Sequence, residues 1–169
     1  MEHMVVYRAL IERAAVRYIA SRRDPVVLAK LTASLSAMAK ARAKHDQIGF
    51  LNYLWEFHAN ICEGSGNPFL LQAWNVASNL IRLYMHRAIA TINQDDQLVN
   101  NRAILDAMRE KTPARAEQIT RGLMIKVAHI LLERPVPEAV RDCVESSVFP
   151  ESRYENMATN LNRVALASK

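Results

Sequence analysis

The feature of the sequence that most restricts its fold is a helix-start signal that occurs three times. A polar residue able to cap a helix directly precedes a proline in Asp24-Pro25, Asn67-Pro68 and Thr112-Pro113. The capping side chain accepts a hydrogen bond from a free backbone N–H, and proline suits the first helical position because it lacks the donor that would stay unpaired there. Each pair therefore predicts the start of a helix, and Asp46 is a further candidate cap.

Between these signals, apolar residues recur at the spacing of one helix face. We predict helices over residues 5–22, 25–44, 47–63, 68–91, 95–111, 113–133, 137–147 and 151–167. No stretch alternates apolar and polar residues as a half-buried strand does. The sequence therefore predicts an all-α fold, an antiparallel bundle of six to eight helices joined by short loops.

Length and composition limit the organisation of the chain. With 169 residues, half of them hydrophobic, the chain suits one domain. We assign residues 5–133 to this domain and 134–169 to a helical extension, which includes an amphipathic helix over 148–169. The first four residues, Met-Glu-His-Met, are set aside as a candidate cloning remnant.

Charge and cysteine content indicate where such a chain works. The formal net charge of +5 comes from scattered basic residues, which are typical of solvated helix faces. No apolar run is long enough to span a bilayer, and the start of the chain lacks the layout of a secretory signal. Cys62 and Cys143 are far apart and fit reduced thiols. We therefore expect a cytoplasmic protein without a membrane partner.

Catalytic motifs are missing from the sequence. It contains no P-loop, no Gly-x-Ser-x-Gly elbow, no His-Glu-x-x-His and no Cys-x-x-Cys. Cys62 lies one helical turn after His58, but a small buried cysteine is the more ordinary interpretation of this spacing than a thiol–imidazole pair. We therefore expect a protein that is not an enzyme. A metal-independent enzyme with His58 as general base remains an alternative, although no second titratable group is evident beside it.

Two polar residues interrupt apolar stripes. His58 lies among Leu51, Leu54 and Ile61, and Asn101 lies between Leu98 and Leu105. Burying a polar group costs a few kcal/mol unless it finds a partner. The pair therefore indicates either a polar pocket that holds a ligand or two core residues with internal partners.

Charged residues near these stripes also allow two interpretations. Arg8 and Glu12 are spaced for an intrahelical ion pair. Arg82, Tyr84, His86 and Arg87 gather near the end of the predicted helix 68–91, where cations favour the helix dipole. Alternatively, an arginine turns inward and binds a ligand carboxylate or phosphate. The candidate ligand-binding residues are therefore Arg8, His58, Arg82, Tyr84 and Asn101.

Several motifs together resemble the FadR-type C-terminal (FCD) domain of GntR-family bacterial transcription regulators. Phe57-His58, followed by Ser65-Gly66-Asn67-Pro68, is similar to the family's Phe-His helix and its Gly-Asn-Pro turn. Arg8-x-x-Ile11-Glu12 resembles the first-helix pattern, and Asn101 to Ala107 resembles a His-x-x-Ile-Leu-x-Ala segment. The resemblance covers about residues 5–130.

The resemblance also implies where a metal would bind. Many family members hold a divalent cation with one aspartate and three histidines. Here the aspartate position falls on Leu54, the first histidine is His58, the second position is Asn101, and the third falls near Leu123. One strong ligand does not hold a metal ion. We therefore predict no metal and no cofactor.

The resemblance implies an effector-binding and dimerising domain that senses a small carboxylate or an acyl-type metabolite such as an acyl-CoA. In this family, an N-terminal winged helix binds the operator DNA, and the FCD domain pairs the subunits. The expected partners are thus a small-molecule effector and a second copy of the chain. The alternative is a dimerisation module whose pocket is filled by Leu54 and Leu123.

Overall fold

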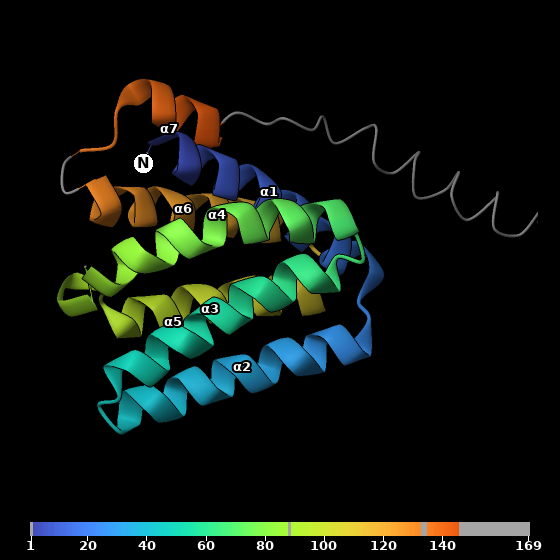
Figure 1. The fold of residues 1–169 in the computed structure, drawn as a ribbon. Helices are drawn as coiled ribbons and strands as arrows, with labels where there is room; N and C mark the ends of the chain where they lie inside the picture. The colour runs from blue at the N-terminus through green and yellow to red at the C-terminus, as the bar shows by residue number, and fades with distance from the viewer. Residues whose placement is uncertain (1, 88, 133–134, 146–169) are drawn as a thin grey trace, which may run out of the picture.

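The structure, a computed structural model, describes residues 2–87, 89–132 and 135–145. Within these ranges the chain forms seven α-helices and one 3-10 helix, and no strand. The elements are α1 (Glu2–Arg22), α2 (Pro25–Ala43), α3 (Gln47–Gly64), α4 (Pro68–Arg87), η1 (Ile89–Thr91), α5 (Gln94–Arg109), α6 (Pro113–Leu132) and α7 (Glu138–Glu145). Successive α-helices run antiparallel (Figure 1), which confirms the predicted all-α bundle.

All four predicted caps directly precede a helix, and in three of them the side chain caps it as expected. The Asp24 carboxylate accepts from the backbone N–H groups of α2, and Asp46 and Asn67 do the same for α3 and α4. Thr112 departs from the prediction, because its hydroxyl donates to the Ala107 carbonyl oxygen at 3.0 Å. A hydroxyl both donates and accepts, and here Thr112 donates from both its hydroxyl and its backbone N–H to the Ala107 carbonyl near the end of α5.

Four tight turns share one backbone feature, a residue in the left-handed region directly before the next helix-start residue. These residues are Arg23, His45, Gly66 and Lys111, with φ of 53°, 57°, 69° and 57°. A left-handed residue ends a helix because it turns the chain away from the helical path. Each turn therefore reverses the chain within a few residues, which keeps successive helices antiparallel.

Helix α1 lies at the centre of the bundle. It packs against α3, α4, α5, α6 and α7, and buried residues occur around much of its circumference. Three of them, Arg8, Glu12 and Arg13, are charged. A central helix that buries charges needs a partner for each one, because an unpaired buried charge is costly. The partners of these three residues define the polar interior of the molecule.

Within α1 to α5, three boundaries differ from the prediction by two residues or more. The helix predicted over 68–91 ends at Arg87, because the chain turns before Asn93, whose side chain caps α5. The helix predicted over 95–111 ends at Arg109, since Lys111 adopts the left-handed conformation. Helix α1 begins at Glu2, so residues 2–4 continue that helix.

The C-terminal part is only partly described. Helix α7 lies within the predicted helix 137–147. The amphipathic helix expected over 148–169 lies outside the described residues. None of the described helices is both long enough and apolar enough to span a bilayer.

Candidate functional site

A fully buried carboxylate, that of Glu12, holds together a polar cluster between α1, α3 and α4. Arg8, one turn earlier on α1, donates from Nε to Glu12 Oε1. His58 on α3 brings Nδ1 to 2.7 Å from Glu12 Oε2, and Trp74 on α4 donates from Nε1 at 3.3 Å to Oε1. Three helices thus converge on one carboxyl group, which we call the Glu12 cluster (Arg8, Glu12, His58 and Trp74).

The electrostatics of the cluster keep Glu12 ionised. Burial by itself raises the pKa of Glu12, but the charges of Arg8 and His58 and their hydrogen bonds outweigh it. The net result lowers the pKa from 4.5 to about 2. Glu12 therefore carries a negative charge at neutral pH, which holds the arginine and the imidazole in position.

Arg8 and His58 each keep polar atoms without a partner among the described residues. Arg8 uses only Nε, so Nη1 and Nη2 make no hydrogen bond there. His58 uses Nδ1, so Nε2 also makes none. The Arg8 guanidinium lies over the Trp55 ring, 5.3 Å from its centroid, and the residue is only 3% exposed. A planar guanidinium with free Nη groups is suited to binding a carboxylate.

Both residues line an interior cavity between α1, α3, α4, α5 and α6. The other lining residues are Leu51, Leu54, Trp55, Arg82, Met85, His86, Gln97 and Val127. Its free volume is about 10 Å³, which is room for about one water molecule. The cavity therefore has the polar groups of a binding site, but in this conformation it is closed around them.

The five predicted ligand-binding residues separate into two groups. Arg8, His58 and Arg82 line the cavity, and Arg82 also donates to Asn52 Oδ1 at 2.7 Å. Tyr84 and Asn101 are not among the lining residues. Tyr84 is 39% exposed on the surface of α4.

Asn101 is fully buried on α5, one turn after the cavity-lining Gln97. Its Nδ2 donates to the Gln97 carbonyl oxygen at 2.9 Å, whereas Oδ1 has no partner among the described residues. Buried acceptors nearly always have a donor. Asn101 Oδ1 is thus a buried acceptor without a donor among the described residues, and it lies outside the lining of the cavity.

The Cys62 thiol is not a nucleophile in this environment. Burial, reinforced by the negative charge of Glu12, raises the pKa of Cys62 well above its usual value, although Arg8 opposes the shift. A thiol that stays protonated is a poor nucleophile. Cys62 is therefore a packing residue of the core.

The donor set around His58 does not fit a metal. Among the described residues, no three His, Cys, Asp or Glu side chains form a group that could hold an ion. The imidazole Nδ1 is bonded to Glu12, and the neighbouring family ligand positions carry Leu54 and Asn101. Leucine offers no donor atom, and an amide is a weak ligand.

The sequence did not reveal the central role of Glu12. The i, i+4 spacing shows its pairing with Arg8, but its contacts with His58 and Trp74 span 46 and 62 residues. The expectation that no titratable group accompanies His58 is therefore wrong. Gln97, which also lines the cavity, carries no distinguishing local pattern, and the sequence marks the cavity-lining His86 only as part of a cluster near a helix end.

Helical bundles form ligand sites between facing helices, and this bundle has a buried polar cluster beside an interior cavity at such a position. The family model of the FCD domain matches residues 3–125. The chain therefore belongs to the FCD domain family, the effector-binding domain of GntR-family transcription regulators. FCD domains are regulatory and not catalytic. No curated protein sequence matches the chain.

Proposed function

We propose that this domain senses a small anionic carboxylate in the cavity beside the Glu12 cluster. The observation that carries the proposal is the buried Arg8, whose Nη1 and Nη2 have no partner among the described residues. A carboxylate fits these donors in a bidentate geometry, with His58 Nε2 available for a further polar group of the ligand.

The charge around the cavity favours an anion. Glu12 neutralises one positive charge, while Arg8 and Arg82 both line the cavity. Among the described residues, the hydrogen-bond partner of Arg82 is a neutral amide, that of Asn52. An incoming carboxylate therefore meets one uncompensated guanidinium without having to displace Glu12.

The size of the cavity favours a small acid over an acyl-CoA. With about 10 Å³ of free volume, any ligand requires the lining side chains to move. Arg82 and His86 are the less buried of the polar lining residues, and both lie near the end of α4. Displacement of these two side chains opens room for a few heavy atoms, whereas an acyl chain requires separation of the helices.

Binding acts on DNA through a change in conformation. A ligand shifts an equilibrium only if it binds one state more tightly than another. Because a bound acid draws Arg8 and Arg82 toward it, it favours a bundle in which α1 and α4 are closer together. In a GntR-family regulator, that change alters the geometry of the winged helices that bind the operator.

Binding should be measured by calorimetry and thermal shift with mono-, di- and hydroxycarboxylic acids of two to six carbon atoms, and with acyl-CoAs. We expect at least one acid to bind and its primary amide to fail. Arg8→Lys, which keeps the charge beside Glu12 but loses the Nη groups, should weaken binding at least tenfold.

Arg22→Lys is the matched control, because Arg22 lies on the same helix over the Tyr18 ring and away from the cavity. It should bind the acid as the unmodified protein does. Equal affinity of the Arg8→Lys and Arg22→Lys variants would refute the assignment of Arg8.

A second function, a dimerisation module without a ligand, is favoured by one observation. Leu54 and Leu123 are both almost fully buried, and the cavity holds only about 10 Å³. If none of the acids and acyl-CoAs changes the melting temperature, this interpretation replaces the first.

Both proposed functions include the formation of a homodimer. Helix α4 exposes three large apolar residues at intervals of seven, Phe69, Val76 and Leu83. No charged residue occurs on α4 before Arg82, so most of this face is neutral and pairing does not require desolvation of a charge. The stripe is symmetric about Val76, so an antiparallel pair of α4 helices related by a two-fold axis aligns each stripe with its copy.

A further inference from the structure

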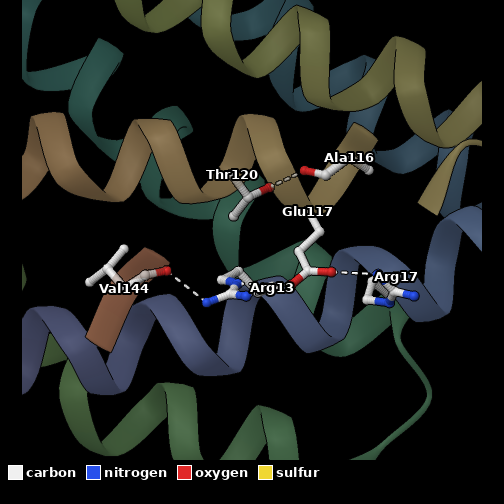
Figure 2. A network of polar contacts seen from close by, with 6 residues as sticks. All are labelled: Arg13, Arg17, Ala116, Glu117, Thr120 and Val144. Carbon is white, nitrogen blue, oxygen red and sulfur yellow. Dashed lines mark hydrogen bonds and ion pairs between the residues drawn. The ribbon is translucent and has the colours of Figure 1, made fainter. Parts of the chain in front are cut away.

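A second buried ion cluster joins α1 to the C-terminal helix. Arg13 Nη2 donates to Oε1 of Glu117 on α6 at a distance of 2.5 Å. The other carboxylate oxygen of Glu117, Oε2, forms an ion pair with Arg17 (Figure 2). Arg13, which is only 2% exposed, also donates from Nη1 to the Val144 carbonyl oxygen at 2.7 Å. One guanidinium thus binds both α6 and the last turn of α7.

Helix α7 depends on this contact for its position. It has eight residues, and isolated helices of that length are unstable in water. On its apolar side, Val140 packs with Val136, Val5 of α1 and Ala128 of α6, whereas Val144 belongs to the main core. The Arg13 guanidinium also lies at the negative end of the α7 dipole. When Arg13 moves, α7 therefore loses both the hydrogen bond to the Val144 carbonyl and the favourable interaction of the charge with the dipole.

The two ion clusters lie on adjacent residues of α1. Glu12 faces α3 and α4, whereas Arg13 faces α6 and α7. In Figure 1, α7 lies alongside the N-terminal half of α1, next to α6. A rotation or shift of α1 therefore changes the geometry of both clusters at once.

We propose that α7 is a latch, held by the Arg13–Glu117 contact, whose docking is coupled through α1 to the Glu12 cluster. Undocking of α7 releases the constraint on α1 and loosens the Glu12 cluster; conversely, disturbance of that cluster weakens the docking of α7. The regulatory meaning of the coupling rests on the proposed effector site, but the coupling itself exists without ligand. By linkage, any ligand that shifts α7 has its own affinity changed by α7 to the same degree.

The test uses the full chain without ligand. Hydrogen–deuterium exchange reports on the amides of α7, and intrinsic fluorescence reports on the Glu12 cluster, because the only two tryptophans of the sequence are Trp55 and Trp74. In Glu117→Gln, we expect exchange in α7 to rise at least tenfold and the emission maximum to shift. Exchange in α2 should stay at the unmodified rate, which separates local release from global unfolding.

Glu110→Gln is the matched control. It makes the same chemical change in an exposed ion pair, with Arg115 of α6, and should alter neither readout. If Glu117→Gln does not fold, Arg13→Lys serves instead, since lysine keeps the charge but cannot span Glu117 and the Val144 carbonyl as a guanidinium does.

Three results would overturn the proposal: unchanged exchange in α7, exchange in α2 that rises equally, or release of α7 without a change in emission. If both readouts change as expected but no acid binds, the proposed effector site is wrong, whereas the coupling between α7 and the Glu12 cluster still holds.

Discussion

At the scale of single residues, the interior of this bundle is organised by charge. Glu12 is fully buried, yet it stays ionised because Arg8, His58 and Trp74 all direct polar hydrogens at it. Removing one partner of a buried ion pair leaves the other charge buried without an opposite charge. The loss of stability is then much larger than the net contribution of the ion pair to the free energy of unfolding. Conservative replacements are therefore the informative ones at this site.

The lowered pKa of Glu12 predicts a pH dependence of stability. The pKa falls from 4.5 in the unfolded chain to about 2 in the folded protein, so the unfolded state binds more protons in this window. The stabilisation from Glu12, about 3 kcal/mol from the size of the shift, is therefore complete above pH 4.5 and is lost as the pH falls toward 2.

Glu12→Gln should flatten this part of the stability curve. Urea unfolding at several pH values between 2 and 6 measures it, with Glu63→Gln, in an exposed pair with Lys30, as the control. Parallel curves for the unmodified protein and Glu12→Gln would contradict the assigned pKa.

The unpaired Oδ1 of Asn101 predicts an unusual effect of an apolar substitution. Asn101→Leu removes a buried acceptor without a partner and keeps a similar volume, so the free energy of unfolding should rise or remain within about 1 kcal/mol. Asn60→Leu, also buried, breaks a 2.9 Å hydrogen bond to Ser34 and should lower it by about 1–3 kcal/mol. Chemical denaturation compares the two variants, and an equal loss in both would argue against the special status of Asn101.

At the scale of elements, the fold depends on sharp turns that combine a left-handed residue with a following helix start. The turn between α3 and α4 uses Gly66 with φ of 69°, and Asn67 then caps α4. The turns before α2, α3 and α6 use residues with side chains in the same conformation. Glycine is thus advantageous at this position, although the other turns show that it is not obligatory.

Gly66→Ala should lower the free energy of unfolding by about 1–2 kcal/mol, because alanine resists the left-handed conformation. Gly122→Ala should have the opposite sign, since Gly122 lies inside α6 and an added methyl group meets nothing within 4 Å. The expected gain is about 0.5–1 kcal/mol from helix propensity. Thermal unfolding followed by circular dichroism measures both, and a gain in Gly66→Ala would refute the role of this turn.

At the scale of the whole molecule, α4 presents an exposed apolar stripe formed by Phe69, Val76 and Leu83. A stable dimer buries roughly 800 Å² per partner, more than one helix face supplies. The proposed pairing therefore extends beyond the stripe of Phe69, Val76 and Leu83 to other exposed residues, such as Tyr84 on the same helix. The association should consequently depend strongly on the central position of the stripe.

Val76→Glu should convert the proposed dimer into a monomer, because it places two like charges beside each other on the two-fold axis. Val99→Glu is the matched control, since Val99 on α5 is 67% exposed and Val76 is 69% exposed. Light scattering after size-exclusion chromatography distinguishes the species. A monomeric unmodified protein would contradict the dimer itself, and a dimeric Val76→Glu variant would exclude α4 as its surface.

Local chemistry made most of the helical architecture predictable. Capping by Asp24, Asp46 and Asn67 and the position of proline after the cap act within a few residues, so the starts of α2, α3 and α4 follow from the sequence. The end of α4 was not predictable in the same way. Its apolar pattern continues past Arg87, and the chain turns there because Asn93 begins the next helix.

In the candidate site, too, contacts within one helix were predictable from the sequence, whereas contacts between helices were not. Spacing alone pairs Arg8 with Glu12, and an apolar stripe marks His58 as buried, because both relations lie within one helix. Only the packing of α3 and α4 against α1 brings His58 and Trp74 to Glu12, and only the packing of α6 and α7 brings Glu117 and Val144 to Arg13. Helix periodicity determines which side of a helix a residue occupies, whereas the partner across the interface depends on how separate helices dock.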